Sequence, residues 1–222
     1  MGAAPAPGRF VVFEGGESVG KSTQAAWLAT RRGACLTFEP GDTRLGRELR
    51  RLLLDERAGG LSAVTEALLM AADRAQHVAE TIRPALEAGR DVVCDRYIGS
   101  SLAYQGYGRG LRLDVVRELS EIAAVGLWPD LMILLDMDPL QARARDDARD
   151  DARDGARDGA REDARSDRFE ALDEAFHRRV RDGYLELAAA DPGRWAVIDA
   201  DRPAPVVRDD IAAVVADRLG WK

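Results

Sequence analysis

The chain contains little histidine, cysteine and lysine. The scarcity of histidine argues against a histidine metal site, and that of cysteine against a disulfide-stabilised protein. The two histidines, His77 and His177, are far apart in sequence and lack metal-ligand spacing, so we interpret both as structural. The two cysteines, Cys35 and Cys94, lie in apolar segments that read as buried strands. We interpret them as reduced core thiols rather than a disulfide, which fits a reducing cytoplasm.

Basic charge is not in excess either. The chain has 32 Lys and Arg against 39 Asp and Glu, a net charge of -7, which disfavours non-specific binding to nucleic acid or to an anionic membrane. No segment reaches the roughly 18 apolar residues of a membrane span, and the first ten residues lack the pattern of a secretory signal. We therefore expect a cytoplasmic protein that binds neither nucleic acid nor membrane, and whose anionic ligands meet local positive sites.

What the chain does contain is a regular alternation of short apolar runs and helical patterns. With 222 residues, 46% of them hydrophobic, it can bury a full core, and we expect a single domain over 1–222. Five Val-, Ile- and Leu-rich runs are nearly continuous in hydrophobicity, which is typical of strands buried on both faces. They cover 9–14, 35–39, 91–95, 131–136 and 195–199, and helical patterns cover 21–32, 43–54, 62–87, 113–125, 168–190 and 206–219. The alternation predicts an α/β fold, a five-stranded parallel sheet with helices on both faces.

Three of the predicted strands end in an acidic residue that is followed by an unusual segment. Glu14 precedes a glycine loop, Glu39 precedes "PGDT", and Asp95 precedes "RY". Ligands of open parallel sheets bind beyond the carboxyl ends of the strands. We therefore expect the chemistry of this protein at that edge of the sheet.

The first of these segments is the strongest motif in the chain. "GGESVGKS", residues 15–22, matches G-x-x-x-x-G-K-[ST] between a predicted strand and a predicted helix. Its glycines allow backbone N–H groups to point inward, and the helix end adds positive potential. Lys21 is expected to reach the β and γ phosphates of a nucleotide, and the Ser22 hydroxyl to bind Mg²⁺. The predicted ATP contacts in this loop are Gly15, Gly16, Glu17, Ser18, Val19, Gly20, Lys21, Ser22 and Thr23.

A lysine in this position is informative because the chain is so rich in arginine. All but two of its basic residues are Arg, and the only lysines are Lys21 and Lys222. An ammonium group is a compact point charge, whereas a guanidinium group is a planar fork. The exception at position 21 therefore indicates that a compact cation is required there.

The phosphate loop is followed by further segments in a distinctive order: "EPGDTRLGRELRRLLLD", "EALLMAADRAQHVAETIRPAL", "DRYIGSSLAYQGYGRG", "PDLMILLD" and "DRFE". In their order and spacing they closely resemble the thymidylate kinase family, over nearly the whole chain from "FVVFEGGESVGKSTQ" to "WAVIDA". The resemblance implies a P-loop kinase fold with a mobile lid, and Mg²⁺-dependent transfer of a phosphoryl group from ATP to dTMP. It also implies a homodimer.

The resemblance assigns roles around the acceptor phosphate. Arg96 is implied to clamp that phosphate, as a guanidinium can do bidentately, and Asp95 to be a partner of the metal and its water. Arg50 matches a further phosphate-contacting arginine. Glu17 matches an acidic residue that approaches the acceptor's sugar and helps to exclude ribonucleotides. Lys21, Arg96 and Glu17 are therefore the predicted catalytic residues outside the lid.

The resemblance also assigns contacts with the acceptor base. Met70 and Arg74 are four residues apart and share one face of a predicted helix. Position 70 is implied to pack on the thymine ring, and Arg74 to bind a base oxygen. The amide of Gln105 both donates and accepts hydrogen bonds and can read a pyrimidine edge. Ser101 and Phe38 complete the predicted substrate contacts on this side.

Taken one at a time, these residues have simpler interpretations. Met70 is more typical of core filling, and Gln105 is equally typical of a polar loop. Arg50 fits a solvated helix face, and the Asp95–Arg96 pair fits a surface ion pair.

The chain also departs from the family pattern in four places. Phe38 stands where many members carry Arg, and Asp42 replaces a glycine. Met70 replaces a common Phe, and Ser18 occupies the place of a catalytic arginine found in one subgroup. Two alternatives therefore stay open: a related kinase with another pyrimidine or deoxynucleotide acceptor, and a P-loop nucleotide-binding regulatory protein with little turnover.

The repeat "ARDDARDDARDGARDGAREDARSDRFE", 144–170, begins where the family has its lid. Its acidic and basic residues alternate, unlike a nucleic-acid-binding arm. In a helix a four-residue repeat drifts by roughly 40° per unit, so no fixed face forms. Gly155 and Gly159 each cost about 1 kcal/mol relative to Ala, which offsets the weak Asp–Arg pairs. We interpret the middle of the repeat as a solvated spacer, either a fraying helix or a disordered insert.

The ends of the repeat carry the predicted lid, at about 143–170. Arg143 is implied to contact ATP, and Arg165 and Arg168 to be the catalytic lid arginines, because Ser18 supplies no charge. Phe169 is implied to cover the acceptor sugar and Glu170 to lie at the metal site.

Overall fold

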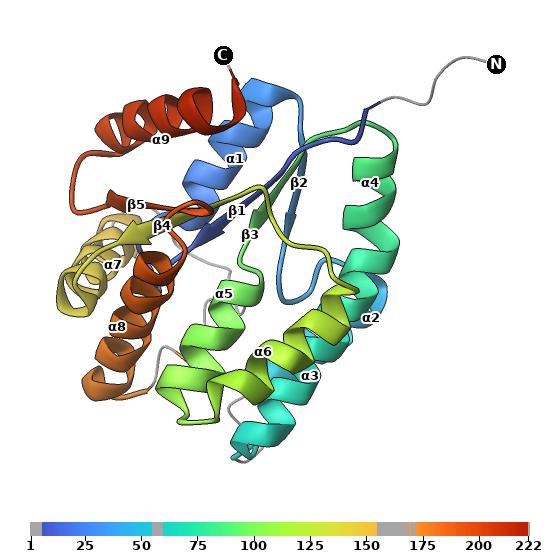
Figure 1. Cartoon of the computed structure of the whole chain (residues 1–222). Coiled ribbons are helices and arrows are strands. Elements are labelled where there is room, and N and C mark those ends of the chain that lie inside the picture. Colours follow the sequence, from blue (N-terminus) through green and yellow to red (C-terminus); the bar gives the residue numbers. More distant parts are fainter. Residues whose placement is uncertain (1–5, 55–59, 155–168, 170–171, 222) are drawn as a thin grey trace.

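A fully parallel five-stranded sheet with the strand order β2-β3-β1-β4-β5 forms the centre of the molecule (Figure 1). The computed structural model describes residues 6–54, 60–154, 169 and 172–221, with the backbone alone for 149–154. The strands are β1 (Phe10–Glu14), β2 (Cys35–Phe38), β3 (Val92–Asp95), β4 (Leu131–Asp136) and β5 (Trp195–Asp199). The predicted α/β fold is confirmed, and every strand boundary lies within one residue of its predicted position.

Burial along the strands follows their place in the sheet. β1 is buried throughout, and β3 and β4 are buried except at their last residues, which explains their continuous hydrophobicity. The edge strands β2 and β5 are only partly buried, and Leu36 and Val197 are exposed. Both cysteines are free thiols, as expected, but only Cys94 is buried. Cys35 is half-buried because it belongs to an edge strand.

The helices cover both faces of the sheet (Figure 1). α1 (Lys21–Arg32) and α9 (Ala204–Leu219) lie on one face, and their apolar side chains form a single cluster with that face. The other face carries α3 (Ala63–His77), η2 (Val78–Ile82), α4 (Arg83–Glu87), α5 (Ile98–Ser101), η3 (Leu102–Gly108), α6 (Leu113–Ala124) and α8 (Glu174–Ala190). α2 (Arg44–Leu54) lies beside α3. No described helix combines the length and the apolar character needed to cross a lipid bilayer.

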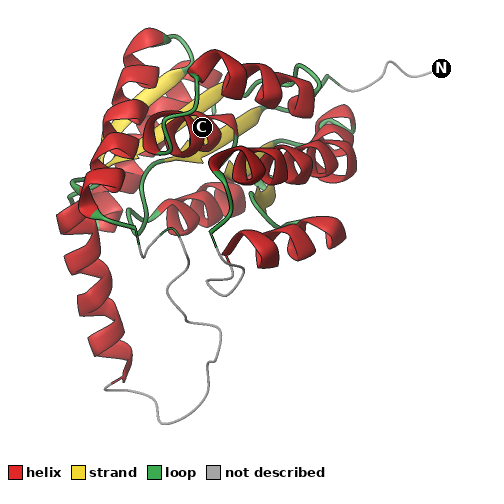
Figure 2. Cartoon of the chain, turned by 90° about the horizontal axis from the view of Figure 1, so that it is seen from below, coloured by secondary structure: helices red, strands yellow, loops and turns green. Residues whose placement is uncertain are grey.

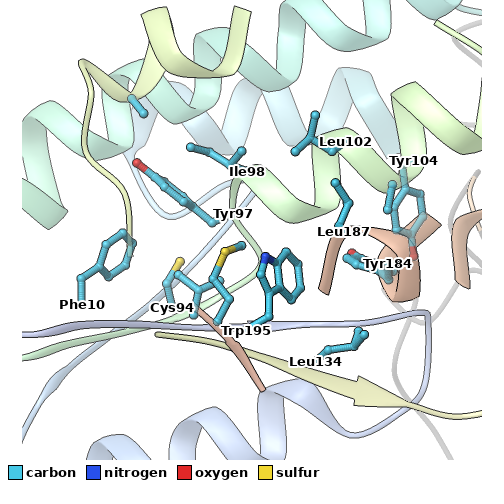
Figure 3. Close-up of a cluster of buried hydrophobic side chains, with 14 of the residues drawn as sticks. Phe10, Cys94, Tyr97, Ile98, Leu102, Tyr104, Leu134, Tyr184, Leu187 and Trp195 are labelled. Carbon is cyan, nitrogen blue, oxygen red and sulfur yellow. The ribbon is translucent and has the colours of Figure 1, made fainter. Parts of the chain in front are cut away.

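Aromatic side chains join α8 to the sheet and to η3 (Figure 3). The Tyr184 ring makes edge contacts with Tyr104 and Trp195, each with centroids 6.4 Å apart. Phe10 and Tyr97 make a further edge contact at 5.1 Å. Edge-to-face aromatic pairs contribute about 0.5–1.5 kcal/mol beyond the burial of their area. These contacts fix the position of η3 relative to α8 and β5, and the position of Tyr97, just before α5, relative to β1.

Residues 98–108 form helix, although the sequence patterns place no helix there. α5 runs directly into the π-helical segment η3. The segment contains several glycines, which disfavour helix in isolation. A Cβ added to Gly108 would lie 2.7 Å from Phe176 Cε2, so glycine allows α8 to approach closely. Tertiary packing overrides local propensity here, and π-helical turns are frequent at functional sites.

The first units of the repeat belong to α7 (Pro139–Asp154), which runs out from the body of the molecule (Figure 2). The remaining units, 155–168, lie outside the described residues. The helix predicted over 168–190 is α8, which begins at Glu174. The Asp173 side chain caps it by accepting a 2.7 Å hydrogen bond from the Phe176 amide.

Candidate active site

A cavity of about 460 Å³ lies at the carboxyl ends of β1, β2 and β3, between the phosphate loop, α2, α3 and η3. Every predicted substrate-binding residue lines it: Glu17, Phe38, Arg50, Met70, Arg74, Arg96, Ser101, Gln105 and Phe169. Six residues of the predicted ATP loop line it as well: Glu17, Ser18, Gly20, Lys21, Ser22 and Thr23. The fold thus gathers segments that are far apart in sequence at one edge of the sheet.

The phosphate loop adopts a conformation that requires glycine. Gly15 and Gly20 have φ values of 141° and 96°, and a Cβ on Gly15 would lie 2.5 Å from the Leu135 carbonyl oxygen. α1 then begins at Lys21 without a side-chain cap. Its first amide N–H groups are therefore available to an anion, and the helix dipole favours negative charge at the same point.

Lys21 points back across this loop. Its side chain is only 6% exposed, and Nζ donates a hydrogen bond to the carbonyl oxygen of Gly16. Burial and the nearby charge of Arg96 lower the pKa of Lys21 to about 8, against the opposing effect of Glu17 and Asp95. A phosphate bound at this point would add negative charge beside the buried ammonium and so favour its charged form. The other lysine, Lys222, lies outside the described residues.

Ser22 and Asp95 provide a pair of oxygen ligands beside the loop. Ser22 Oγ donates a 2.5 Å hydrogen bond to Asp95 Oδ2, while Asp95 Oδ1 is buried and has no hydrogen-bond partner among the described residues. Mg²⁺ prefers such oxygens and is often held by one or two protein ligands together with phosphates. The absence of a cluster of three or more acidic, His or Cys side chains from the described part of the chain is compatible with that mode. Glu170, the third predicted metal residue, lies outside the described residues.

Arg96 is held over the mouth of the loop by three partners. Its guanidinium donates to Glu17 Oε2 at 2.7 Å, to the Gly15 carbonyl oxygen at 3.0 Å and to Ser100 Oγ at 3.3 Å. Arg96 also has a φ of 71°, in the left-handed region that few non-glycine residues adopt. Such strain persists only where the surroundings fix it, and it is frequent at functional sites. The simpler interpretation as a surface pair with Asp95 is wrong, because Arg96 pairs with Glu17.

Glu17 is bound from two sides. Besides Arg96, the Tyr104 hydroxyl donates a 2.5 Å hydrogen bond to Oε1. Burial raises its pKa, but the charges of Arg96 and Lys21 together with these hydrogen bonds outweigh burial and lower the pKa to about 2. Glu17 is therefore a fixed anion at neutral pH. Tyr104 was not predicted from the sequence, because a tyrosine in a glycine-rich segment carries no signal of its own.

A buried carboxylate, Glu14, supports Arg96 indirectly, through Ser100. Glu14 is fully buried and accepts hydrogen bonds from Ser100 Oγ at 2.6 Å, Tyr184 at 3.1 Å and the Tyr97 amide at 3.1 Å. Burial raises the pKa of Glu14, opposed by Ser100 and Arg96. Glu14 was predicted only as the end of a strand. Its contacts tie α8 to the residue that holds Arg96.

Arg74 lies at the far end of the cavity in a buried network. It donates to Glu39 Oε2 at 3.0 Å and to Ser101 Oγ at 3.0 Å, and it stacks over Tyr97 at 5.1 Å. Glu39, which was predicted only as a strand end, fixes the guanidinium plane. Met70 is half-buried and both packs against the core and lines the cavity, and its contact with the thymine ring stays a prediction.

Gln105 is buried and helical, so its interpretation as a polar loop residue is wrong. Its amide Nε2 donates a 2.9 Å hydrogen bond to Glu66 Oε1, and Glu66 forms an ion pair with Arg109. Neither Glu66 nor Arg109 was predicted, since both are common residue types without a motif.

Two of the four departures from the family pattern, Phe38 and Asp42, lie at the end of β2 and in the turn that follows it. Asp42 Oδ2 accepts a 2.6 Å hydrogen bond from Thr37, whose hydroxyl also contacts His77. Asp42 is thus bonded within the turn, and His77 is a buried structural residue as predicted. Arg50 donates to the Pro40 carbonyl oxygen at 2.8 Å and lies over the Phe38 ring at 5.9 Å. Arg50 is half-buried at the cavity rather than on a fully solvated face.

Little of the predicted lid falls within the described residues. Arg143 is exposed on α7 and does not line the cavity, and Arg145 donates to the Ala200 carbonyl oxygen at 3.2 Å. Phe169 is buried against Tyr104, with ring centroids 5.7 Å apart, and lines the cavity as predicted. Arg165 and Arg168 lie outside the described residues.

A phosphate loop with a buried lysine, an oxygen pair suited to Mg²⁺ and a guanidinium in the same cavity define the class of P-loop phosphotransferases. A profile of the family described as "Thymidylate kinase" matches residues 13–211. The chain belongs to the thymidylate kinase family, so it is a nucleoside monophosphate kinase.

Individual relatives cover almost the whole chain. It is 48% identical over 215 residues to the thymidylate kinase of Solidesulfovibrio magneticus, which covers 95% of this chain and 100% of the relative. It is 50% identical over 218 residues to the thymidylate kinase of Leifsonia xyli, which covers 96% and 95%. The crystal structure of thymidylate kinase from Ehrlichia chaffeensis superposes with a TM-score of 0.70 at 30% identity, covering 94% of this chain and 99% of that chain. The predicted family and fold are confirmed.

Proposed function

We propose that this chain transfers the γ-phosphoryl group of ATP to dTMP, forming dTDP for deoxynucleotide synthesis, as a single domain in the cytoplasm. The observation that carries the proposal is one cavity lined at one end by Lys21 and Ser22 of the phosphate loop and at the other by Arg74 and Gln105. Such a cavity suits two phosphorylated ligands that meet near Arg96. Family membership supports ATP as the donor.

The reaction needs positioning and charge neutralisation rather than proton transfer, because the acceptor's phosphate oxygen is already anionic. In this proposal Lys21 and the α1 amides bind the donor phosphates, and Arg96 binds the acceptor phosphate. Ser22 and Asp95 hold Mg²⁺, which when bound supplies positive charge to the transferring group. Glu17 keeps Arg96 in place and approaches the acceptor's sugar. Arg143, Arg165 and Arg168 stay the proposed lid arginines.

An ADP-release assay with ATP, Mg²⁺ and a panel of nucleoside monophosphates tests this proposal. We expect dTMP to give the highest kcat/KM, because Arg74 donates and Gln105 can accept a hydrogen bond at the base end. A higher kcat/KM with another acceptor would overturn the dTMP assignment. Met70 and Phe38, which depart from the family pattern, both line the cavity where the acceptor would bind. No turnover with any acceptor would favour a nucleotide-binding regulatory protein.

We also propose a homodimer through α3 and α6, which pack side by side (Figure 1). Val64 and Leu68 of α3 and Val115 and Ile122 of α6 are at least half exposed. Contiguous exposed apolar side chains on neighbouring helices are typical of subunit interfaces.

Introducing a charge on this surface is expected to dissociate the dimer. Ile122→Glu would place a carboxylate in an apolar interface, where burial of an unpaired charge is strongly unfavourable. Light scattering after gel filtration should report twice the chain mass for the parent protein and the chain mass for Ile122→Glu. Val206→Glu on α9 is the matched control, since Val206 is an exposed valine on the other side of the sheet. An unchanged dimer in Ile122→Glu would place the interface elsewhere.

A further inference from the structure

The amide of Gln105 is bound on one side only. Gln105 is 1% exposed and lines the cavity from η3, and its Nε2 donates a 2.9 Å hydrogen bond to Glu66 Oε1. Among the described residues, no hydrogen bond reaches Gln105 Oε1. The amide therefore has its NH2 group committed to the protein, and its carbonyl oxygen is the atom left for a ligand.

Glu66 determines which way round this amide lies. Glu66 is fully buried on α3, and Arg109 pairs with both of its oxygens, with Nε 3.2 Å from Oε1 and Nη2 2.9 Å from Oε2. Both Glu66 oxygens accept hydrogen bonds from Arg109, so Oε1 meets the Gln105 amide as an acceptor. A flipped Gln105 amide would place two oxygens against each other between buried side chains, where the low local dielectric makes their repulsion strong.

Arg109 is itself fixed by aromatic rings. Its guanidinium lies over Phe176 at 5.0 Å and over Phe169 at 5.8 Å. Phe176 belongs to α8, and Phe169 lines the same cavity as Gln105. Cation–π contacts with two rings restrict the plane of the guanidinium, and hence the direction of the fork toward Glu66.

We infer that Glu66 and Arg109 are positioning residues that set the base specificity of this kinase, by presenting Gln105 as a fixed hydrogen-bond acceptor. This rests on the proposed function, in which the acceptor base occupies this end of the cavity. A pyrimidine with an N3–H donor, thymine or uracil, matches that acceptor. Cytosine has an acceptor at N3 and meets the Gln105 carbonyl oxygen without a proton between them. Sites built around buried hydrogen bonds discriminate strongly in this way, because a mismatched ligand leaves a buried group unpaired.

The test compares dTMP, dUMP and dCMP as acceptors for the whole chain and for Glu66→Gln. The variant's new amide can donate as well as accept, so the orientation of Gln105 is no longer dictated. We expect the ratio of kcat/KM for dTMP over dCMP to fall by about tenfold or more. The dUMP-to-dCMP ratio should fall by the same factor, since uracil shares N3–H with thymine. Glu174→Gln is the matched control, because Glu174 forms an exposed ion pair with Arg178 on α8.

A purely structural role would change all three acceptors alike. Equal losses for dTMP, dUMP and dCMP in Glu66→Gln, or no change in a folded variant, would overturn the inference. If Glu66→Gln does not fold, as melting temperature and circular dichroism would report, Arg109→Lys carries the same test, since lysine keeps the charge and loses the fork. Absence of dTMP turnover in the parent protein would overturn the proposed function instead, so the two failures are distinguishable.

Discussion

Replacing Arg96 by alanine is expected to lower kcat/KM for dTMP by about a thousandfold or more, the range in which arginines act on transferring phosphoryl groups. The guanidinium lies at the junction of the two halves of the cavity, and its position is over-determined by Glu17, Ser100 and the Gly15 carbonyl oxygen. Its pKa is well above the usual range, because the charge of Glu17 beside it outweighs the opposing effect of burial. Arg96 thus brings a positive charge that is always present and already in position. Alanine removes both this charge and the planar guanidinium that would bind the phosphate.

Two companion variants separate this role from stability. Arg96→Lys keeps the charge but cannot bind Glu17 and a phosphate with one planar group, so most of the loss should remain. Arg178→Ala removes an exposed arginine that pairs with Glu174, and it should leave the kinetics within about twofold. Steady-state kinetics with dTMP and ATP varied separately, together with melting temperatures, give the comparison. A folded Arg96→Ala enzyme within tenfold of the parent would exclude Arg96 from phosphate binding.

The sheet was predictable because its central strands are buried on both faces, which leaves a continuous apolar signal in β1, β3 and β4. The phosphate loop was predictable for a different reason. A backbone that curls around phosphate needs glycine at φ values such as those of Gly15 and Gly20, so the sequence is constrained by geometry. Both features are local in sequence, so a few adjacent residues are enough to predict each of them.

The partners of the predicted site residues were not predictable in the same way. Arg74 and Gln105 were identified through the family resemblance, but Glu39 and Glu66, which orient them, are separated from them by tens of residues. Buried carboxylates look like surface residues in a sequence, because burial depends on contacts that only the fold creates. Tyr104 and Ser100 were hidden further by a helix that their glycine-rich segment does not predict.

The repeat shows the opposite limit. Its four-residue period is obvious in the sequence, yet the period fixes no face, and slipping it by one unit gives another equivalent arginine. The structure places the first units in α7, beyond Pro139, and the roles of Arg165 and Arg168 stay predictions. A regular sequence therefore gives less information about the site than the irregular segments around it.

Lys21→Ala is expected to lower kcat to about a thousandth of the parent value. Losses of this size follow the removal of a group that stabilises the charge developing in the transition state. Lys21 is almost fully buried, its Nζ is held at the Gly16 carbonyl oxygen, and it is the one lysine in the part of the chain that the structure describes. Lys21→Arg should restore little, because the planar guanidinium is larger than the space that the ammonium fills. Turnover of Lys21→Ala above about a tenth of the parent rate would show that the phosphate-loop mechanism is wrong.

The acid–base behaviour of Lys21 gives this prediction a second, independent measurement. Its pKa of about 8 in the free protein lies below the ordinary value because of burial and Arg96, so Lys21 loses its proton within the accessible pH range. ATP binds the protonated form and raises this pKa, so affinity is full below pH 8 and falls as pH rises, by up to about tenfold per pH unit. Calorimetric titration of ATP between pH 7 and 9.5 should show this decline in the parent protein. Lys21→Arg stays charged throughout and should show weaker but pH-independent binding, whereas a flat profile in the parent would mean that Lys21 does not contact the donor phosphates.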